Sequence, residues 1–452
     1  MKRNIITLIL MALVSLQSLA ATFVGDRNDF RDETIYFVMT TRFYDGDPSN
    51  NTQCWDNQER NQGDPAWRGD FKGLIEKLDY IKALGFTTVW ITPVVENASG
   101  YDYHGYHAFN FSRVDSRYES EDVDFQDLID AAHERGMKVI MDLVVNHTST
   151  EHEWFKKSRQ RIEPYTDYYI WRPAKENGKL PNNWDSLFEG KAWAWDEVRQ
   201  EYYMHLFAIE QADLNMDNPL VREEVKKVLK FWLDMGVDGF REDVITFISK
   251  KEGLPDDYIM PASKGFNYFN HGPHLHEYLE EFKNDVFSKY DCMTLAEAPM
   301  VTPKVALKYI DETENPVLDM MIQFATQEAD SFMTDYIHMP FNLKKLKRTY
   351  TKWQTQLDGK GWNMLYIENH DHPRMVSRYG SEKYREESAK MLAVSYLFQK
   401  GTPFIYQGQE IGMTNWYPTD PEMYEDVQTR WQYFNVATRK SPEKRLERLW
   451  HG

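Results

Sequence analysis

An amphipathic helix that ends at a glycine and is followed at once by a short apolar strand recurs along this chain. Three such helices end near Gly85, Gly136 and Gly236. The strand-forming runs that follow them lie at residues 87–91, 139–144 and 239–244. Glycine adopts the left-handed conformation that ends many helices, and short apolar runs favour buried strands. The pattern therefore predicts repeated helix–strand units around a parallel sheet.

Five further short apolar runs raise the number of predicted strands to eight. They are Ile35–Met39, Met293–Ala298, Val317–Phe324, Met364–Glu368 and Phe404–Gln407. Eight units favour a (β/α)8 TIM barrel over a doubly wound sheet. The sequence also lacks the Gly-rich phosphate-binding loop that is typical of such sheets.

The repeat breaks between Asn146 and Asp213, where the chain is rich in Trp, Tyr, Pro and Asn. Long excursions of this kind leave a barrel at its catalytic end, so we expect an inserted domain B after strand 3. The predicted organisation is a signal peptide at 1–20, a first part of the barrel at 21–147, domain B at 148–212 and a second part of the barrel at 213–452.

The N-terminus has the features of a cleavable export signal. Lys2 and Arg3 precede a mostly apolar run from Ile5 to Val14, and Ser18-Leu19-Ala20 offers a cleavage site after Ala20. The apolar run is shorter than a membrane span requires. We therefore expect an exported protein, either periplasmic or secreted, with no membrane span after cleavage.

Composition excludes one class of partner. The formal net charge of the 452 residues is -18, and the chain has no basic cluster, so it would repel the phosphates of a nucleic acid. The two cysteines, Cys54 and Cys292, do not require a disulfide, and we expect two buried thiols. We also expect a monomer.

Several predicted strands run into polar residues. Asp142 and His147 follow strand 3, Glu297 ends strand 5, and His370 and Asp371 follow strand 7. On strand 4, Arg241 and Asp243 are two residues apart. They therefore face the same side, where the guanidinium keeps the carboxylate ionised. A structural ion pair is the alternative for this pair alone. Several carboxylates and two histidines on one rim are costly to bury without a function.

Four of these segments, in this order, resemble the motifs of the α-amylase superfamily, glycoside hydrolase family 13. They are Asp142–His147, Gly239–Asp243, Thr294–Glu297 and Asn369–Asp371. The resemblance extends over nearly all of the chain after residue 20. It implies that Asp243 is the nucleophile, Glu297 the general acid/base and Asp371 the residue that stabilises the transition state.

The same resemblance implies a set of substrate-binding residues. Arg241 would orient Asp243, and His147 and His370 would hydrogen-bond the sugar in subsite −1. The other members of the set are Asp102, Tyr106 and Arg374. Asp102 and Arg374 would close the subsite as an ion pair, or form a surface pair without a role. Tyr106, like Trp184, is either part of the site or a core aromatic.

The chain resembles two branches of the family. Segments such as Pro181–Trp184 and Gln211–Asn215 are similar to oligo-1,6-glucosidases and α-glucosidases, although Ala212 stands where that group usually has proline. Phe43–Asn51 and Tyr103–Tyr106 are more similar to neopullulanases, cyclodextrinases and α-amylases.

These resemblances together imply a retaining α-glucoside hydrolase that acts on short α-glucans: isomalto-oligosaccharides, maltodextrins and starch fragments. Val244, directly after the nucleophile, is the residue that the first group associates with a preference for α-1,6 bonds. The alternatives are an endo-acting α-amylase or neopullulanase, a transglycosylase and a non-catalytic starch-binding protein. The intact Asp243, Glu297 and Asp371 argue against the last.

One polar loop carries hard oxygen ligands at close spacing. With Asp70, which follows Gly69, the set is Asp45, Asp47, Asn50 and Asn51. Such oxygens suit Ca²⁺, and the loop binds calcium in related enzymes. A turn built from these residue types is the alternative. A second calcium site of α-amylases uses a histidine where this chain has Phe247, so we do not expect it. No organic cofactor is expected.

The C-terminal end differs from the family pattern. The resemblance leads us to expect a last barrel helix and a β-sandwich domain C that the 452 residues do not contain. In the alternative prediction, Glu443–Trp450 folds back as the closing helix, because Leu446, Leu449 and Trp450 have helical spacing.

Overall fold

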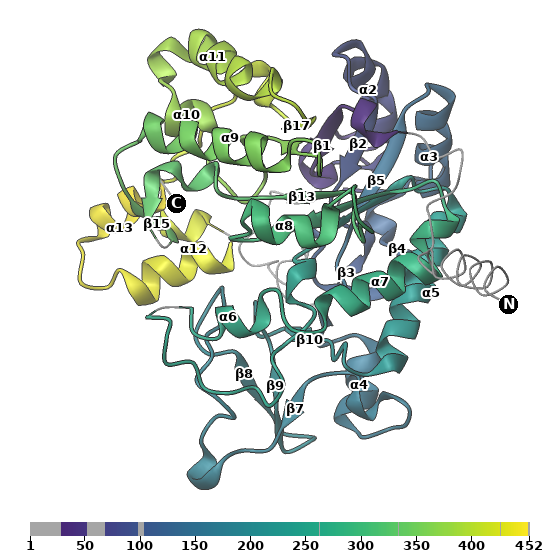
Figure 1. Ribbon diagram of the computed structural model, residues 1–452, viewed down its shortest axis with the longest axis vertical. Coiled ribbons are helices and arrows are strands. Elements are labelled where there is room, and N and C mark those ends of the chain that lie inside the picture. The colour runs from purple at the N-terminus through teal and green to yellow at the C-terminus, as the bar shows by residue number, and fades with distance from the viewer. Residues whose placement is uncertain are drawn as a thin grey trace, which may run out of the picture.

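The computed structural model describes residues 29–51, 68–97, 104–261, 263–332, 334–424 and 426–450. At its centre lies an eight-stranded sheet in which neighbouring strands run parallel (Figure 1). Its strands are β1 (Ile35–Val38), β2 (Thr88–Ile91), β5 (Lys138–Leu143), β11 (Gly239–Glu242), β12 (Met293–Glu297), β13 (Met320–Ile322), β16 (Met364–Leu365) and β17 (Thr402–Tyr406). The order β13-β12-β11-β5-β2-β1-β17-β16 follows the chain around a barrel. The predicted TIM barrel is therefore confirmed.

Helices surround this sheet. They are α2 (Phe71–Ala83), α3 (Phe125–Glu134), α5 (Pro219–Met235), α7 (Leu275–Asp285), α8 (Pro303–Ile310), α9 (Leu343–Leu357), α10 (Met375–Tyr379) and α11 (Arg385–Leu397). The side chain of Asn218 accepts a hydrogen bond at the start of α5, and Gly236, with φ 108°, ends it as predicted. Phe37 faces the barrel interior, whereas its neighbours Tyr36 and Val38 pack toward the helices.

The stretch after strand 3 builds a separate lobe, which lies below the barrel in Figure 1. Its three-stranded antiparallel sheet has the order β7-β9-β8. The elements of this lobe are β6 (His147–Ser149), α4 (Glu153–Arg159), β7 (Trp171–Arg172), β8 (Trp193–Asp196), β9 (Glu201–Met204) and β10 (Gln211–Asp213). Strands β6 and β10 pair antiparallel, so the chain leaves and re-enters the barrel at one place. Trp184 is fully buried, as a core aromatic would be.

The remaining elements are connections. They are β3 (Val95–Asn97), β4 (Ala108–Val114), α6 (Phe266–Phe269), β14 (Ser331–Phe332), β15 (Thr334–His338), α12 (Val427–Trp431) and α13 (Pro442–Leu449). The helix α13 forms where the alternative prediction placed one. It packs through Leu446 and Leu449 against Tyr336 of β15 and against Tyr433. Within the described ranges, no helix has the length and apolar character to cross a membrane.

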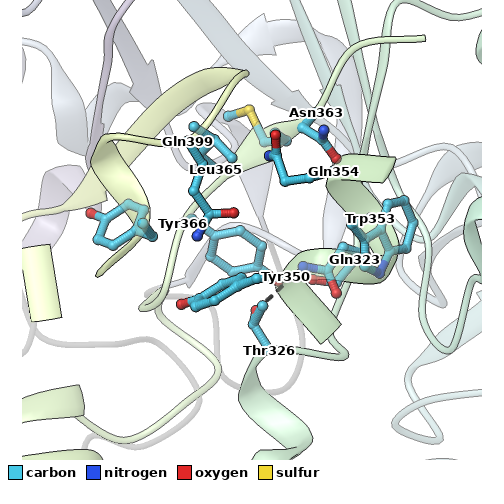
Figure 2. Close-up of a pocket in the computed structure, with 11 residues that line it drawn as sticks. Gln323, Thr326, Tyr350, Trp353, Gln354, Asn363, Leu365, Tyr366 and Gln399 are labelled. Carbon is cyan, nitrogen blue, oxygen red and sulfur yellow. Dashed lines mark hydrogen bonds between the residues drawn. The ribbon is translucent and has the colours of Figure 1, made fainter. Parts of the chain in front are cut away.

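The barrel has a seam between β13 and β16, the two ends of the hydrogen-bonded order. Both strands are shorter than the predicted runs, because the backbone leaves the sheet early on either side. A side chain bridges the seam: the Tyr366 hydroxyl donates to the Gln323 carbonyl oxygen at 2.7 Å. Figure 2 shows the small pocket outside this seam, with Gln323 and Thr326 opposite Tyr350 and Trp353 of α9.

Of the two cysteines, Cys292 is buried, and its sulfur lies 3.8 Å from the Phe287 carbonyl oxygen. Cys54 and the predicted signal peptide at 1–20 lie outside the described residues. That both cysteines are buried free thiols therefore stays a prediction.

Candidate active site

Arg241 is the centre of the site at the C-terminal end of the barrel. One of its terminal nitrogens, Nη1, lies 2.5 Å from Asp142 Oδ1 and 2.7 Å from Asp243 Oδ1. The other, Nη2, lies 2.7 Å from Glu297 Oε1. The predicted neighbours Arg241 and Asp243 thus lie side by side. The sequence reasoning missed that Asp142 and Glu297 share the same guanidinium, although the parallel pairing of β5, β11 and β12 aligns their ends.

The electrostatics of this cluster are coupled. Burial raises the pKa of the Asp243 carboxyl, and the Arg241 cation opposes that rise. Burial raises the pKa of Glu297 as well, again against Arg241, with Asp371 adding repulsion. One cation faces three carboxyl groups in a low-dielectric interior, so full ionisation would leave uncompensated negative charge. The cluster therefore favours keeping a proton.

Glu297 has a second donor. Its Oε2 accepts the backbone N–H of Val244 at 2.9 Å. Val244 has φ 36° and ψ 38°, a left-handed conformation that is rare for a β-branched residue and costs about 1–3 kcal/mol. The backbone turns sharply here, directly after Asp243, and this turn aims the amide at Glu297.

Tyr106 and His370 line the other side of Arg241. The Tyr106 hydroxyl donates to Asp142 Oδ2 at 2.9 Å, and its ring lies parallel to that of His370 with centroids 5.7 Å apart. Asp371 Oδ1 lies 3.3 Å from His370 Nε2, and the Asp371 side chain is 45% exposed. The Asp371 side chain is thus accessible to solvent, whereas the Asp243 side chain is only 11% exposed and lies deeper.

His147 lies beside Tyr106, at the start of the inserted lobe. Its Nε2 is 3.1 Å from the Tyr106 carbonyl oxygen and 3.1 Å from Gln211 Nε2. Burial lowers the pKa of His147 to about 4, so the ring is neutral near pH 7. Burial also lowers the pKa of His370, whose Nδ1 is buried without a hydrogen-bond partner. Its other nitrogen, Nε2, lies 3.1 Å from the Tyr106 hydroxyl.

Arg374 pairs with an acid that the sequence analysis did not name as its partner. Its Nη1 lies 2.5 Å from Glu368 Oε1 and donates to the Gln407 carbonyl oxygen at 2.8 Å. Asp102, its expected partner, lies outside the described residues. Glu368 was visible as the polar end of strand 7, but its pairing follows from the turn of the chain after β16.

A buried lysine joins the barrel to the inserted lobe. Lys250 Nζ lies 2.7 Å from Asp213 Oδ1 and donates to Asn146 Oδ1 at 3.0 Å. The ammonium thus fills the space among these oxygens. Sequence reasoning missed this residue, because a single lysine after strand 4 carries no distinctive signal.

The side-chain oxygens at the loop predicted to bind calcium fall into two groups: those that accept hydrogen bonds and those that do not. Asp70 caps α2 and holds the loop: its oxygens accept the backbone N–H groups of Gly46, Asp47 and Gly73. Asp47 accepts from Ser49. In contrast, three oxygens are buried without a hydrogen-bond partner: Asp45 Oδ1, Asn50 Oδ1 and Asn51 Oδ1. Unpaired buried oxygens of this kind fit a hard cation.

A second acidic group lies on α5 and α7, away from the barrel end, and consists of Glu223, Glu281 and Asp285. The Lys226 ammonium already contacts all three carboxylates, at 2.5–2.9 Å. This group is therefore an ion-pair cluster on the helix surface.

A TIM barrel whose strand ends bring the carboxyl groups of Asp142, Asp243 and Glu297 to one arginine fits a glycoside hydrolase. The catalytic-domain model of the alpha-amylase family matches residues 37–446. The chain therefore belongs to the alpha-amylase family.

Three relatives illustrate the likeness. The oligo-1,6-glucosidase of Parageobacillus thermoglucosidasius is 47% identical over 430 residues, which are 93% of this chain and 73% of the relative. The crystal structure of Bacillus licheniformis trehalose-6-phosphate hydrolase superposes with a TM-score of 0.81 at 40% identity and covers 93% of this chain and 72% of that one. The trehalulose synthase of Pseudomonas mesoacidophila MX-45 gives a TM-score of 0.82 at 36% identity, over 93% of this chain and 73% of that one.

Proposed function

We propose that this chain is a retaining α-glucosidase that hydrolyses short α-glucans through a covalent glycosyl-enzyme. The observation that carries the proposal is the contact of one guanidinium, that of Arg241, with both Asp243 and Glu297. A retaining enzyme needs its two carboxyl groups about 5–5.5 Å apart, and a shared arginine favours such close spacing. The similarity to oligo-1,6-glucosidases indicates the substrate class.

In this proposal Asp243 attacks the anomeric carbon and Glu297 protonates the leaving oxygen, then activates water in the second step. Arg241 holds Asp243 in its attacking position. Asp371 faces the sugar ring and stabilises its positive charge. His147 and His370 are neutral near pH 7, so they act as hydrogen-bonding groups for the hydroxyls of the bound glucose.

The test of this proposal is a pair of amide variants. Asp243→Asn should reduce hydrolysis of an aryl α-glucoside by several orders of magnitude with folding unchanged, because an amide cannot form the glycosyl-enzyme. Glu297→Gln should affect isomaltose more than an activated aryl glucoside, because a good leaving group needs less protonation. Activity of Asp243→Asn within about tenfold of the parent, or equal losses for Glu297→Gln on both substrates, would contradict these roles.

The linkage preference is proposed to be α-1,6. Val244 directly follows the nucleophile and packs in a buried cluster with Phe207 and Phe247, so the proposal is that its branched side chain shapes the site from behind. A difference of one or two methyl groups supplies about 1–3 kcal/mol of discrimination. A higher kcat/KM for maltose than for isomaltose would overturn this preference.

Transglycosylation is the second candidate, and the similarity to a trehalulose synthase favours it. Both reactions share the covalent intermediate and differ only in whether water or a sugar attacks it. Product analysis at high concentrations of isomaltose or sucrose separates them. Early products that are only the free monosaccharides of the substrate support hydrolysis, whereas a new disaccharide or a trisaccharide supports transfer.

Calcium binding at the loop is a further part of the proposal. Asp45, Asn50 and Asn51 would supply the oxygens, since theirs are buried and unpaired. Asp70 would keep the loop in place. Asp47 is the remaining predicted ligand. A bound ion would stabilise the loop and carries no step of the reaction. Addition of Ca²⁺ to chelator-treated protein should raise its Tm, and Asp45→Asn should abolish that rise.

Export is proposed from the first 20 residues alone, with a periplasmic or secreted enzyme as the result. Mass spectrometry of the protein recovered from its host checks the cleavage after Ala20. An intact N-terminus on protein purified from the cytoplasm would contradict the proposal.

A further inference from the structure

The short helix α12 lies on the side of the barrel that faces the inserted lobe (Figure 1). Its start is fixed by Asp426, whose carboxylate accepts the Thr429 N–H at 2.6 Å. Two further contacts hold the helix. The Thr429 hydroxyl lies 3.1 Å from the Tyr336 hydroxyl of β15, and Arg430 donates to the Tyr424 carbonyl oxygen. These contacts tie α12 to β15 and to the loop that precedes the helix.

The start of α12 carries a carboxylate, that of Asp426. Asp426 lies among protein atoms deeply enough for burial to raise its pKa, and repulsion by Asp371 adds to the rise. Its side chain is nevertheless exposed to solvent.

Gln428, on the first turn of α12, bridges to the inserted lobe. Its side-chain Nε2 donates to the backbone carbonyl oxygen of Leu187 at 3.1 Å. The backbone N–H of Leu187 is itself bonded to the Leu206 carbonyl oxygen at 2.7 Å, so this part of the lobe is held from both sides.

The lobe end of the bridge leads to the active site. Phe188, next to Leu187, packs edge-on against Phe207 with ring centroids 5.1 Å apart. Phe207 in turn packs against His147 at 5.2 Å. The bridge thus joins α12 to the part of the lobe that packs against His147.

We propose that the Gln428–Leu187 bridge closes one side of the substrate pocket and makes Gln428 a specificity-determining residue that restricts the enzyme to short glucans and chain ends. This inference rests on the proposed α-glucosidase function and adds how that site limits substrate length. Gln428 is a positioning residue: it acts through Leu187, Phe188 and Phe207 on the sugar-binding His147.

The bridge is one neutral hydrogen bond to a backbone carbonyl. Such a bond contributes modestly, so its loss should change binding by about two- to tenfold and leave the fold intact. Gln428→Leu removes the donor at similar size, and Gln428→Lys keeps a donor that can reach the same carbonyl. Gln354→Leu is the matched control. Gln354 also donates from its side chain to a backbone carbonyl, that of Lys400 at 2.9 Å, but it lies on α9 outside the barrel.

Kinetics with isomaltose and with a maltoheptaoside blocked at its non-reducing end provide the first test. For Gln428→Leu we expect KM for isomaltose to rise by about two- to tenfold with kcat nearly unchanged, and the ratio of activity on the blocked substrate to activity on isomaltose to rise. Gln428→Lys should restore both values, and Gln354→Leu should leave them unchanged. A parental KM and ratio in Gln428→Leu, or no rescue by lysine, overturns the inference.

Hydrogen exchange separates this inference from the proposed function. In Gln428→Leu, amides of α12 and of residues 187–189 should exchange faster together, whether or not the protein is active. Unchanged exchange in both segments overturns the bridge. If exchange responds as expected in Gln428→Leu but the parent protein hydrolyses no α-glucoside, the proposed function is refuted and the bridge is still supported.

Discussion

Replacement of Glu242 by glutamine should stabilise this protein by an amount that grows with pH. Glu242 lies on β11 between Arg241 and Asp243, but successive strand residues face opposite sides, so its side chain points away from the reaction. It is 1% exposed, and its Oε2 has no hydrogen-bond partner. Burial, with repulsion by Asp319, raises the pKa of Glu242 from 4.5 to about 8.

The sign follows from proton binding. Between pH 4.5 and about 8 the folded state keeps the Glu242 proton and the unfolded state has lost it, so the free energy of unfolding falls as pH rises through this window. The slope for one group is about 1.4 kcal/mol per pH unit, which gives at most about 5 kcal/mol over the window. Glutamine does not titrate and is nearly isosteric, so the variant does not undergo this loss.

Urea denaturation of the parent and of Glu242→Gln at about pH 5, 6.5, 8 and 9 measures the effect. The difference in unfolding free energy should be small at the lowest pH, grow to pH 8 and then level off. Glu134→Gln, at an exposed position on α3, is the control and should show no such growth. Parallel pH dependences for the parent and Glu242→Gln would refute the reasoning, because the carboxyl would then be ionised in the folded protein without cost.

Three further outcomes are expected. Arg241→Lys should lower kcat/KM for an aryl α-glucoside by at least about a hundredfold, because a single ammonium cannot contact three carboxyl groups in the geometry of the guanidinium; a loss below about tenfold would contradict this. Lys250→Met should lower the free energy of unfolding by about 3–5 kcal/mol in urea titrations, because it leaves a buried carboxylate unpaired, while Lys227→Met on the helix surface should change it by less than about 1 kcal/mol. Gly265→Ala should lower Tm, because Gly265 has φ 92° and a Cβ there would lie 2.4 Å from the Trp184 ring; an unchanged Tm would show that the loop can shift.

Much of the barrel could be predicted because its signals are local. The helical spacing before Gly136 and Gly236 and the apolar runs after them are read directly from neighbouring residues, and the observed strands lie within or next to the predicted ones. The two strands beside the seam, β13 and β16, were predicted too long. Their sequences are apolar beyond the sheet because Tyr366 and Ile367 are buried outside the hydrogen-bonded ladder.

For the candidate site, too, some features could be predicted from the sequence and others could not. The i, i+2 spacing of Arg241 and Asp243 and the order of the four motifs were sufficient to choose the carboxylates. The partners of those residues were not predictable, since Glu297, Asp142 and Asp243 meet one guanidinium only where three strands lie side by side. Arg374 illustrates the limit: its neighbour in space, Glu368, is six residues away, and the sequence suggested a different acid.

The sequence by itself thus determined the helix–strand repeat, the candidate catalytic carboxylates and the family, because these depend on residue types and their spacing along the chain. Only the tertiary structure decided how the charges are compensated, which buried oxygens of the Asp45–Asn51 loop lack a hydrogen-bond partner and how Gln428 reaches Leu187. These features arise from contacts between segments as far as 241 residues apart, and no local pattern encodes such contacts. Their energies depend on burial, which the folded chain alone creates.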